Sequence, residues 1–388
     1  MDAHAEIARA IDSYRDKVVA LSHEIHERPE LKFQEHFAAG LLSKAATELG
    51  LEVEREVGGL KTAFRAEFGA KGPAVAILAE YDALPNGHSC GHNLIAGAAL
   101  SAVAGLKSIG GKLPGRVVFL GTPAEEGGGG KIILIDQGAL RGVDAAMMAH
   151  PTDSEYCTMP ALATQHLKLT FHGHGAHAAL APWDGSSALA AVIQTFQSVD
   201  AMRLHLRDGS RIHGIITDGG QAVNIIPERA ECLFLARGKT SKYAKEMGAR
   251  VIRCAEGAAM ATGTRLEHVV EGGYKNLINN LSMAHRYAAH TEALGTKSVE
   301  APENTPTGST DMGDVSHVMP AIHPSFAISR RGEGNCHEDA FVAHADSQRG
   351  YDAMIRVAKA MAMTAYDLLA EPELLAAAKK EFEARKES

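Results

Sequence analysis

A cysteine and a histidine stand two residues apart in the segment Gly87–Asn93, which reads Gly-His-Ser-Cys-Gly-His-Asn. The glycines let the backbone bend, so the side chains of Cys90 and His92 can be directed toward one point. A thiolate and an imidazole are both ligands that zinc accepts. Taken alone, the pair fits a buried free cysteine beside a helix-start histidine equally well, and the other motifs must decide between the two interpretations.

Two adjacent glutamates, Glu125 and Glu126, follow an apolar segment and precede four consecutive glycines. Neighbouring carboxylates repel each other, and a cation can hold them together. A solvated acidic loop is the commonest fate of such a pair, but the apolar segment and the glycine run favour a site. If Glu126 binds a metal ion, Glu125 stays available as the general base for an activated water, a division of labour that hydrolysis needs.

Two more histidines complete the set of candidate ligands. His150 directly follows the apolar run at 143–149, where a capping or core histidine is the alternative, and His337 precedes a helical stretch near the end of the chain. With Cys90, His92 and Glu126 they make five candidates, which exceed the four ligands of a closed structural zinc site. They predict two divalent metal ions that share a bridging group, for which the Cys90 thiolate is the candidate. Zinc suits a thiolate and manganese accepts nitrogen and oxygen, so both metals stay open.

Three apolar runs must position these residues, and a polar segment follows each run directly. We predict strands at 72–79, 116–121 and 143–149, because chemistry placed after a strand's carboxyl end is typical of α/β folds. The segments 93–108 and 131–138 carry helical apolar patterns and are predicted as crossover helices. The sequence therefore predicts an α/β fold whose catalytic domain has a mixed sheet with helices on both faces.

The middle of the chain follows a different pattern, with the element order β-α-β-β-α-β. This order predicts a ferredoxin-like inserted domain of one sheet and two helices at residues 164–275. The catalytic domain is then discontinuous and takes residues 1–163 and 276–388, and we expect a short strand at 321–329 to rejoin its sheet. Within the insertion, strands are predicted at 166–171, 211–217, 229–237 and 266–271, and helices at 186–204 and 241–262.

Composition narrows the class of protein. The chain has 388 residues and a formal net charge of -8, and its lysines and arginines are scattered. It therefore lacks the basic surface expected of a protein that binds nucleic acid or anionic lipid. Five widely spread cysteines argue against a disulfide framework, and no run approaches the roughly 20 apolar residues of a membrane span. We expect a cytoplasmic protein without a nucleic-acid or membrane partner.

Together these motifs resemble the co-catalytic metallopeptidase family that includes aminoacylase, carboxypeptidase G and hippurate hydrolase. The Cys-Gly-His motif at 90–92 is similar to the amidohydrolase branch, whereas more usual members carry His-x-Asp. Here Glu80-Tyr81-Asp82 stands at that place. This departure removes a histidine ligand but keeps Asp82, which the resemblance implies as an orienting partner of a ligand. Three strings, at 79–94, 120–131 and 308–316, resemble the subgroup of β-alanyl-dipeptide hydrolase and aminobenzoyl-glutamate hydrolase.

The resemblance implies metal-dependent hydrolysis of an amide bond in a small carboxylate-bearing molecule: a dipeptide, an N-acyl amino acid or an aryl-glutamate. It also implies that the inserted domain is a substrate lid and the surface of a homodimer. His177 would reach into the partner's active site and stabilise the oxyanion, although His172 and His174 nearby also fit a weak metal-binding surface. Asn224 and Arg237 match positions that bind a substrate carboxylate.

Plainer interpretations stay open for several of these residues. Asn224 also fits ordinary turn chemistry, and Arg237 fits a surface cation at a strand end. A catalytically silent family member that acts as a binding or regulatory protein is an alternative to the enzyme. A nucleophilic hydrolase using Cys90 with His92 is another, and a thiol-blocking reagent would inactivate it in metal-free form.

Overall fold

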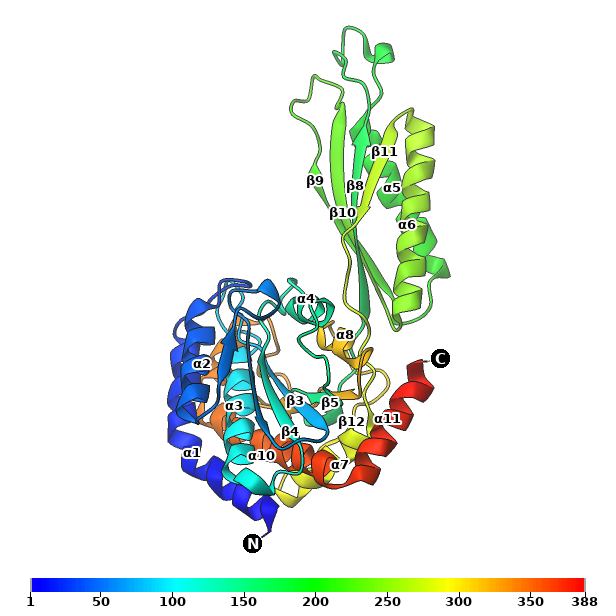
Figure 1. The fold of residues 1–388 in the computed structure, drawn as a ribbon. Helices are drawn as coiled ribbons and strands as arrows, with labels where there is room; N and C mark the ends of the chain where they lie inside the picture. Colours follow the sequence, from blue (N-terminus) through cyan, green and yellow to red (C-terminus); the bar gives the residue numbers. More distant parts are fainter. Residues whose placement is uncertain (1, 387–388) are drawn as a thin grey trace. The chain divides into compact units, whose positions relative to one another are not determined.

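The computed structural model describes residues 2–386, which divide into two compact units. The first unit contains the chain up to Pro160, Leu277–Pro306 and the chain from Asp311 onward. The second contains Ala161–Asn276 and Thr307–Thr310. Figure 1 shows a mixed α/β fold, as predicted from the sequence.

The first unit is built on a six-stranded mixed sheet with the order β1-β2-β4-β3-β5-β13. The neighbours β3, β4, β5 and β13 run parallel, whereas β2 pairs antiparallel with β1 and β4. All six residues of β3 are buried, which explains its continuous apolar run. The strands are β1 (Val53–Arg55), β2 (Phe64–Gly69), β3 (Ala74–Ala79), β4 (Arg116–Gly121), β5 (Ala145–Met147) and β13 (Ala321–Ile322).

Three long helices pack together beside this sheet: α1 (Ala3–His26), α3 (His92–Ser108) and α10 (Gln348–Ala370) (Figure 1). Close approach depends on glycine in α3, since a Cβ at Gly97 would lie 2.4 Å from the sulfur of Met354. The other helices of the unit are α2 (His36–Glu48), α4 (Gly130–Asp136), α7 (Leu281–Ala293), α8 (Met312–Ser316), α9 (Asp339–Ala345) and α11 (Pro372–Lys386). Among residues 2–386, none of the helices has the length and apolar character needed to span a membrane.

The predicted strand at 321–329 is only partly correct. Its first part, β13, joins the main sheet beside β5. Its second part, β14 (Ser325–Ala327), pairs instead with β6 (His150–Thr152) and β7 (Tyr156–Thr158) in a separate sheet that also contains β12 (Val299–Glu300). The strand breaks at His323 and Pro324, because proline has no N–H to donate to a sheet.

The second unit has the predicted element order β-α-β-β-α-β, with an antiparallel sheet ordered β11-β8-β10-β9. Burial alternates along β10, so one sheet face is covered, and α5 and α6 pack on the sheet. This arrangement is compatible with a ferredoxin-like unit. Its elements are β8 (Ala163–His172), α5 (Ala188–Met202), β9 (Arg211–Asp218), β10 (Arg229–Gly238), α6 (Ser241–Thr262) and β11 (Arg265–Val270).

Candidate active site

Cys90 and His92 flank the start of α3. Gly91, between them, has the left-handed φ of 68°, and a Cβ there would lie 2.7 Å from the Pro151 ring. Glycine is therefore required both for the turn and for the close approach of the two segments. The turn leaves Cys90 6% exposed and His92 1% exposed.

His92 is oriented by Asp82. Its Nδ1 lies 2.8 Å from the backbone oxygen of Asp82 and 3.2 Å from Oδ1, so it donates toward that residue. The other carboxylate oxygen of Asp82 accepts from the backbone N–H of Glu126 at 2.8 Å. The Nε2 atom of His92 then faces Glu80 Oε1 at 3.4 Å, and neither atom has a hydrogen-bond partner. Histidines that bind metal through one ring nitrogen usually donate from the other to a carboxylate or backbone oxygen, as Nδ1 of His92 does here.

The five predicted ligands come together, in groups that share members. Cys90, His92 and Glu126 place their ligand atoms within 4.8 Å of one another. His337 Nε2 lies 3.5 Å from Glu126 Oε1 and so joins this group. His150 belongs to two other groups of the same size.

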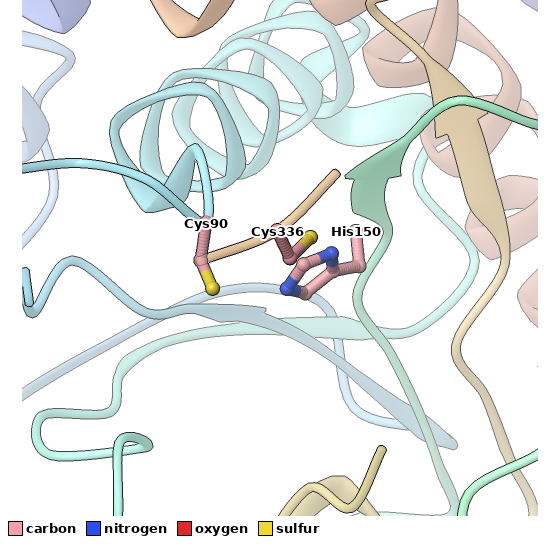
Figure 2. Close-up of side chains that lie close together, drawn as sticks. All are labelled: Cys90, His150 and Cys336. Atoms are coloured by element: carbon pink, nitrogen blue, oxygen red, sulfur yellow. The ribbon is translucent and has the colours of Figure 1, made fainter. Parts of the chain in front are cut away.

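One of the groups containing His150 is completed by Cys90 and Cys336, and the other by Glu80 and His92. Figure 2 shows the two sulfurs and the imidazole of His150 gathered where three chain segments meet. The sequence motifs did not single out Cys336, because nothing in its spacing sets it apart from its neighbour His337.

The protonation states of Glu126 and His150 fit a divalent metal ion. Burial alone would raise the pKa of Glu126, but the hydrogen bond from His337 and the charge of His92 lower it to about 2. Burial and the nearby His92 lower the pKa of His150 to about 4, which keeps its imidazole neutral. The carboxylate of Glu126 and the neutral imidazole of His150 are forms that a metal ion binds. Burial would lower the pKa of His92, but the charge of Glu80 and the hydrogen bond with Asp82 raise it well above the ordinary value, so a bound cation would have to displace its proton.

The thiol of Cys90 differs from that of a nucleophilic cysteine. Its hydrogen bond with Cys336 and its burial raise its pKa well above the ordinary value. Reactive cysteines have a lowered pKa, because the thiolate is the attacking form. A bound cation would deprotonate Cys90 by direct coordination, so the geometry favours a ligand over a nucleophile.

Glu125 is 8% exposed and directly precedes the candidate ligand Glu126. Burial, together with the negative charges of Glu80 and Asp311, raises the pKa of Glu125 well above its ordinary value. The preceding Ala124 has a strained φ of 62°, and its N–H donates to Glu35 Oε1 at 2.9 Å. Glu35, which sequence reasoning missed, thus helps to hold the turn that carries both glutamates.

A buried lysine beside the candidate ligands was also missed. Lys131 is 1% exposed, and its Nζ donates to Glu80 Oε2 at 2.6 Å and to Asp311 Oδ1 at 2.8 Å. Its backbone N–H also donates to Asp311 Oδ2 at 3.0 Å. The available signal was a lysine in the first turn of a helix that follows a buried strand and a glycine run. His323, also missed, is fully buried with its ring centroid 5.6 Å from that of His150.

The remaining predicted residues lie in the second unit. His177 is exposed, and its Nδ1 accepts from the backbone N–H groups of Ala179 and Leu180 at 3.2 and 3.1 Å. The neighbouring Ala178 N–H donates to the backbone oxygen of Asn224 at 3.0 Å. Arg237 is the last residue but one of β10 and donates from Nη1 to Ser309 Oγ at 2.9 Å. His177 and Asn224 are therefore neighbours, whereas Arg237 is anchored separately.

The three histidines that were considered for a weak metal-binding surface have separate contacts. His172 Nε2 pairs with Glu267 at 3.1 Å, and His174 bridges Ser186 through its backbone. Within the described part of the chain, His172, His174 and His177 do not form a cluster of metal ligands.

Comparison with known proteins identifies the family. Residues 76–360 match the model of peptidase family M20/M25/M40. Xaa-Arg dipeptidase of Mus musculus is 38% identical over 97% of this chain and 91% of its own length. A subunit of the p-aminobenzoyl-glutamate hydrolase of Escherichia coli is 28% identical over 94% of this chain and 92% of its own length.

The fold comparison agrees. Bacillus subtilis YXEP, described as a dinuclear metal binding peptidase from the M20 family, superposes with a TM-score of 0.75 at 21% identity, covering 93% of this chain and 99% of that one. The family and the branch predicted from the sequence are confirmed. The chain belongs to peptidase family M20/M25/M40 and is a metal-dependent hydrolase of amide or peptide bonds.

Proposed function

We propose that the chain hydrolyses the amide bond of a small carboxylate-bearing substrate with two divalent metal ions, and that dipeptides are the first class to test. The observation that carries this proposal is that two ligand groups share Cys90, and that one of them contains Glu126, the sequence neighbour of Glu125. A shared thiolate between two ions suits the arrangement in which paired metals act on one substrate.

The chain's own groups then divide the work. When bound, the metal ions would acidify a water molecule and polarise the substrate carbonyl. Glu125 accepts the proton of that water and returns it to the leaving amine. Asp82 holds the ring of His92 and, through the N–H of Glu126, fixes the neighbouring carboxylate at the same time.

The second unit would serve as lid and dimer surface. β9 is one of the two edge strands of its sheet, and its Ile215 and Ile216 are 62% and 46% exposed, which suits pairing with a second copy of the chain. His177 would then stabilise the oxyanion of the partner's substrate. Arg237 and Asn224 would bind the substrate carboxylate, for which the planar guanidinium is suited.

The relatives suggest which substrates to test first. One is named Xaa-Arg dipeptidase, and another is named as a subunit of p-aminobenzoyl-glutamate hydrolase. We therefore propose dipeptides with a C-terminal basic residue, ahead of aryl-glutamates and N-acyl amino acids. The five free cysteines support a reducing compartment such as the cytoplasm.

The test is a hydrolysis screen of these three classes with chelated protein, then with zinc and with manganese restored. We expect turnover that the chelator abolishes and the metal restores, and that is fastest with dipeptides ending in arginine. Absence of turnover with every class and both metals would instead support a catalytically silent binding protein. Turnover that resists the chelator but is lost on thiol blocking would support a Cys90 nucleophile.

A further inference from the structure

Cys336 and His337 are adjacent in the sequence, but their side chains face different groups of the candidate metal site. His337 Nε2 faces Glu126 Oε1 at 3.5 Å, and its side chain is 64% exposed. Cys336 instead turns toward Cys90 and His150 (Figure 2), and its sulfur lies within 4.8 Å of their ligand atoms. The two side chains diverge because His337 has a left-handed φ of 76°.

The segment that carries Cys336 is fixed in this position. The backbone N–H of His337 donates to the oxygen of Ser89 at 3.0 Å. Asn86 Nδ2 donates to Asp339 Oδ1 at 2.9 Å and reaches the His337 oxygen at 3.4 Å. These bonds tie the loop of Cys336 to the loop of Cys90, so the approach of the two thiols is built into the backbone.

We propose that Cys336 is a further metal ligand, and that Cys90, Cys336 and His150 form a thiolate-rich half of the two-metal site. The Nδ1 atom of His150 lies 2.8 Å from the Pro151 oxygen, which leaves Nε2 for the metal. Ligands at usual zinc distances are about 3.8 Å apart in a tetrahedron. Atoms within 4.8 Å need only a small contraction to reach this geometry.

The second half of the site has a different character. Cys90, His92, Glu126 and His337 offer one sulfur, two nitrogens and a carboxylate. Because Cys90 belongs to both groups, it is the shared ligand. The half containing Cys336 should prefer a thiophilic ion such as zinc, whereas the other half should accept manganese as well. This inference rests on the two-metal site proposed above and adds the selection of the metal.

The test uses cobalt(II) as an optical probe with the full-length protein kept under a phosphine reductant. Thiolate-to-cobalt charge transfer reports the number of coordinating sulfurs, and it needs no substrate. Wild-type protein is compared with Cys336→Ser, with Cys336→Asp, and with the control Cys254→Ser, which changes a partly buried thiol in the other unit.

We expect Cys336→Ser to lose roughly half of the charge-transfer intensity of the cobalt ion in the half formed by Cys90, Cys336 and His150, because one of its two sulfurs is gone. The same ion should also bind at least about tenfold more weakly. Cys336→Asp should recover binding without recovering the intensity, which guards against a folding defect, and Cys254→Ser should match the wild type.

Wild-type intensity and affinity in Cys336→Ser would overturn the assignment and leave Cys336 as a packing thiol. That result would not affect the proposed hydrolysis. Conversely, a chain in which Cys336 contributes to the cobalt spectrum but which cleaves no substrate would refute the proposed function alone.

Discussion

Replacing the buried Lys131 with methionine should strongly destabilise the first unit. The ammonium group stands between the carboxylates of Glu80 and Asp311, and all three side chains are at most 1% exposed. At an effective dielectric constant of 20, each pair at these distances attracts by about 6 kcal/mol. Most of that attraction offsets the cost of removing three ions from water, so the network adds little net stability.

Removing the cation alone is different, because two carboxylates then stay buried without compensation. Loss of one partner of a buried pair costs about 3–5 kcal/mol, and we expect Lys131→Met to lower the free energy of unfolding by this amount. The loss should shrink as the pH falls, because protonated Glu80 and Asp311 carry no charge. It should also be partly recovered by adding Asp311→Asn.

Urea unfolding followed by circular dichroism, with chelator present so that no cation replaces the ammonium, measures this loss. Lys17→Met is the matched control. Lys17 pairs with Glu48 at the surface, where both side chains are more than 40% exposed, and its loss should have far less effect. A Lys131→Met variant as stable as the wild type at pH 8 would refute the reasoning.

Other predictions concern pH and assembly. Burial raises the pKa of Glu35 from 4.5 to about 7, so the folded state binds a proton that the unfolded state releases. The free energy of unfolding should therefore fall by about 3 kcal/mol as pH rises from 4.5 to 7. In denaturant titrations at several pH values, the free energy of unfolding of Glu35→Gln should depend less on pH. Burial would raise the pKa of Asp367, but hydrogen bonds from His290, Arg286 and His4 lower it. The stability that the ionised carboxylate contributes is therefore lost as pH falls. In the same titrations, Asp367→Asn should lower the free energy of unfolding by roughly 1–3 kcal/mol, and most at neutral pH. Ile215→Lys should convert a dimer into monomers in light scattering.

The parts of the fold that were predicted well have strong local signals. The strand at 116–121 was predicted with its observed bounds because the five residues after Arg116 are apolar and buried. The helix at 241–262 was also predicted with its observed bounds, since Thr240 caps its start and Gly263 ends it in a left-handed turn. By contrast, the break at His323 was missed, because a choice between two sheets depends on distant partners.

The site residues that were predicted likewise have local sequence signals, whereas those that were missed depend on distant partners. Cys90, His92 and Glu126 stand in dense motifs, where neighbouring residues reveal one another. Cys336 and Lys131 belong to the site only through contacts with residues far away in the sequence, Cys90 for Cys336 and Glu80 for Lys131. Spacing along the chain carries no information about such contacts.

The turnover number of Glu125→Gln at matched metal content tests the central claim most directly. The side chain keeps its size but cannot carry the proton, whereas the ligands are untouched. We predict two metal ions per chain by elemental analysis, as in the wild type, and turnover lower by roughly 10²–10⁴-fold. Undiminished turnover at full metal content would contradict the account, because Glu125 would then not move the proton.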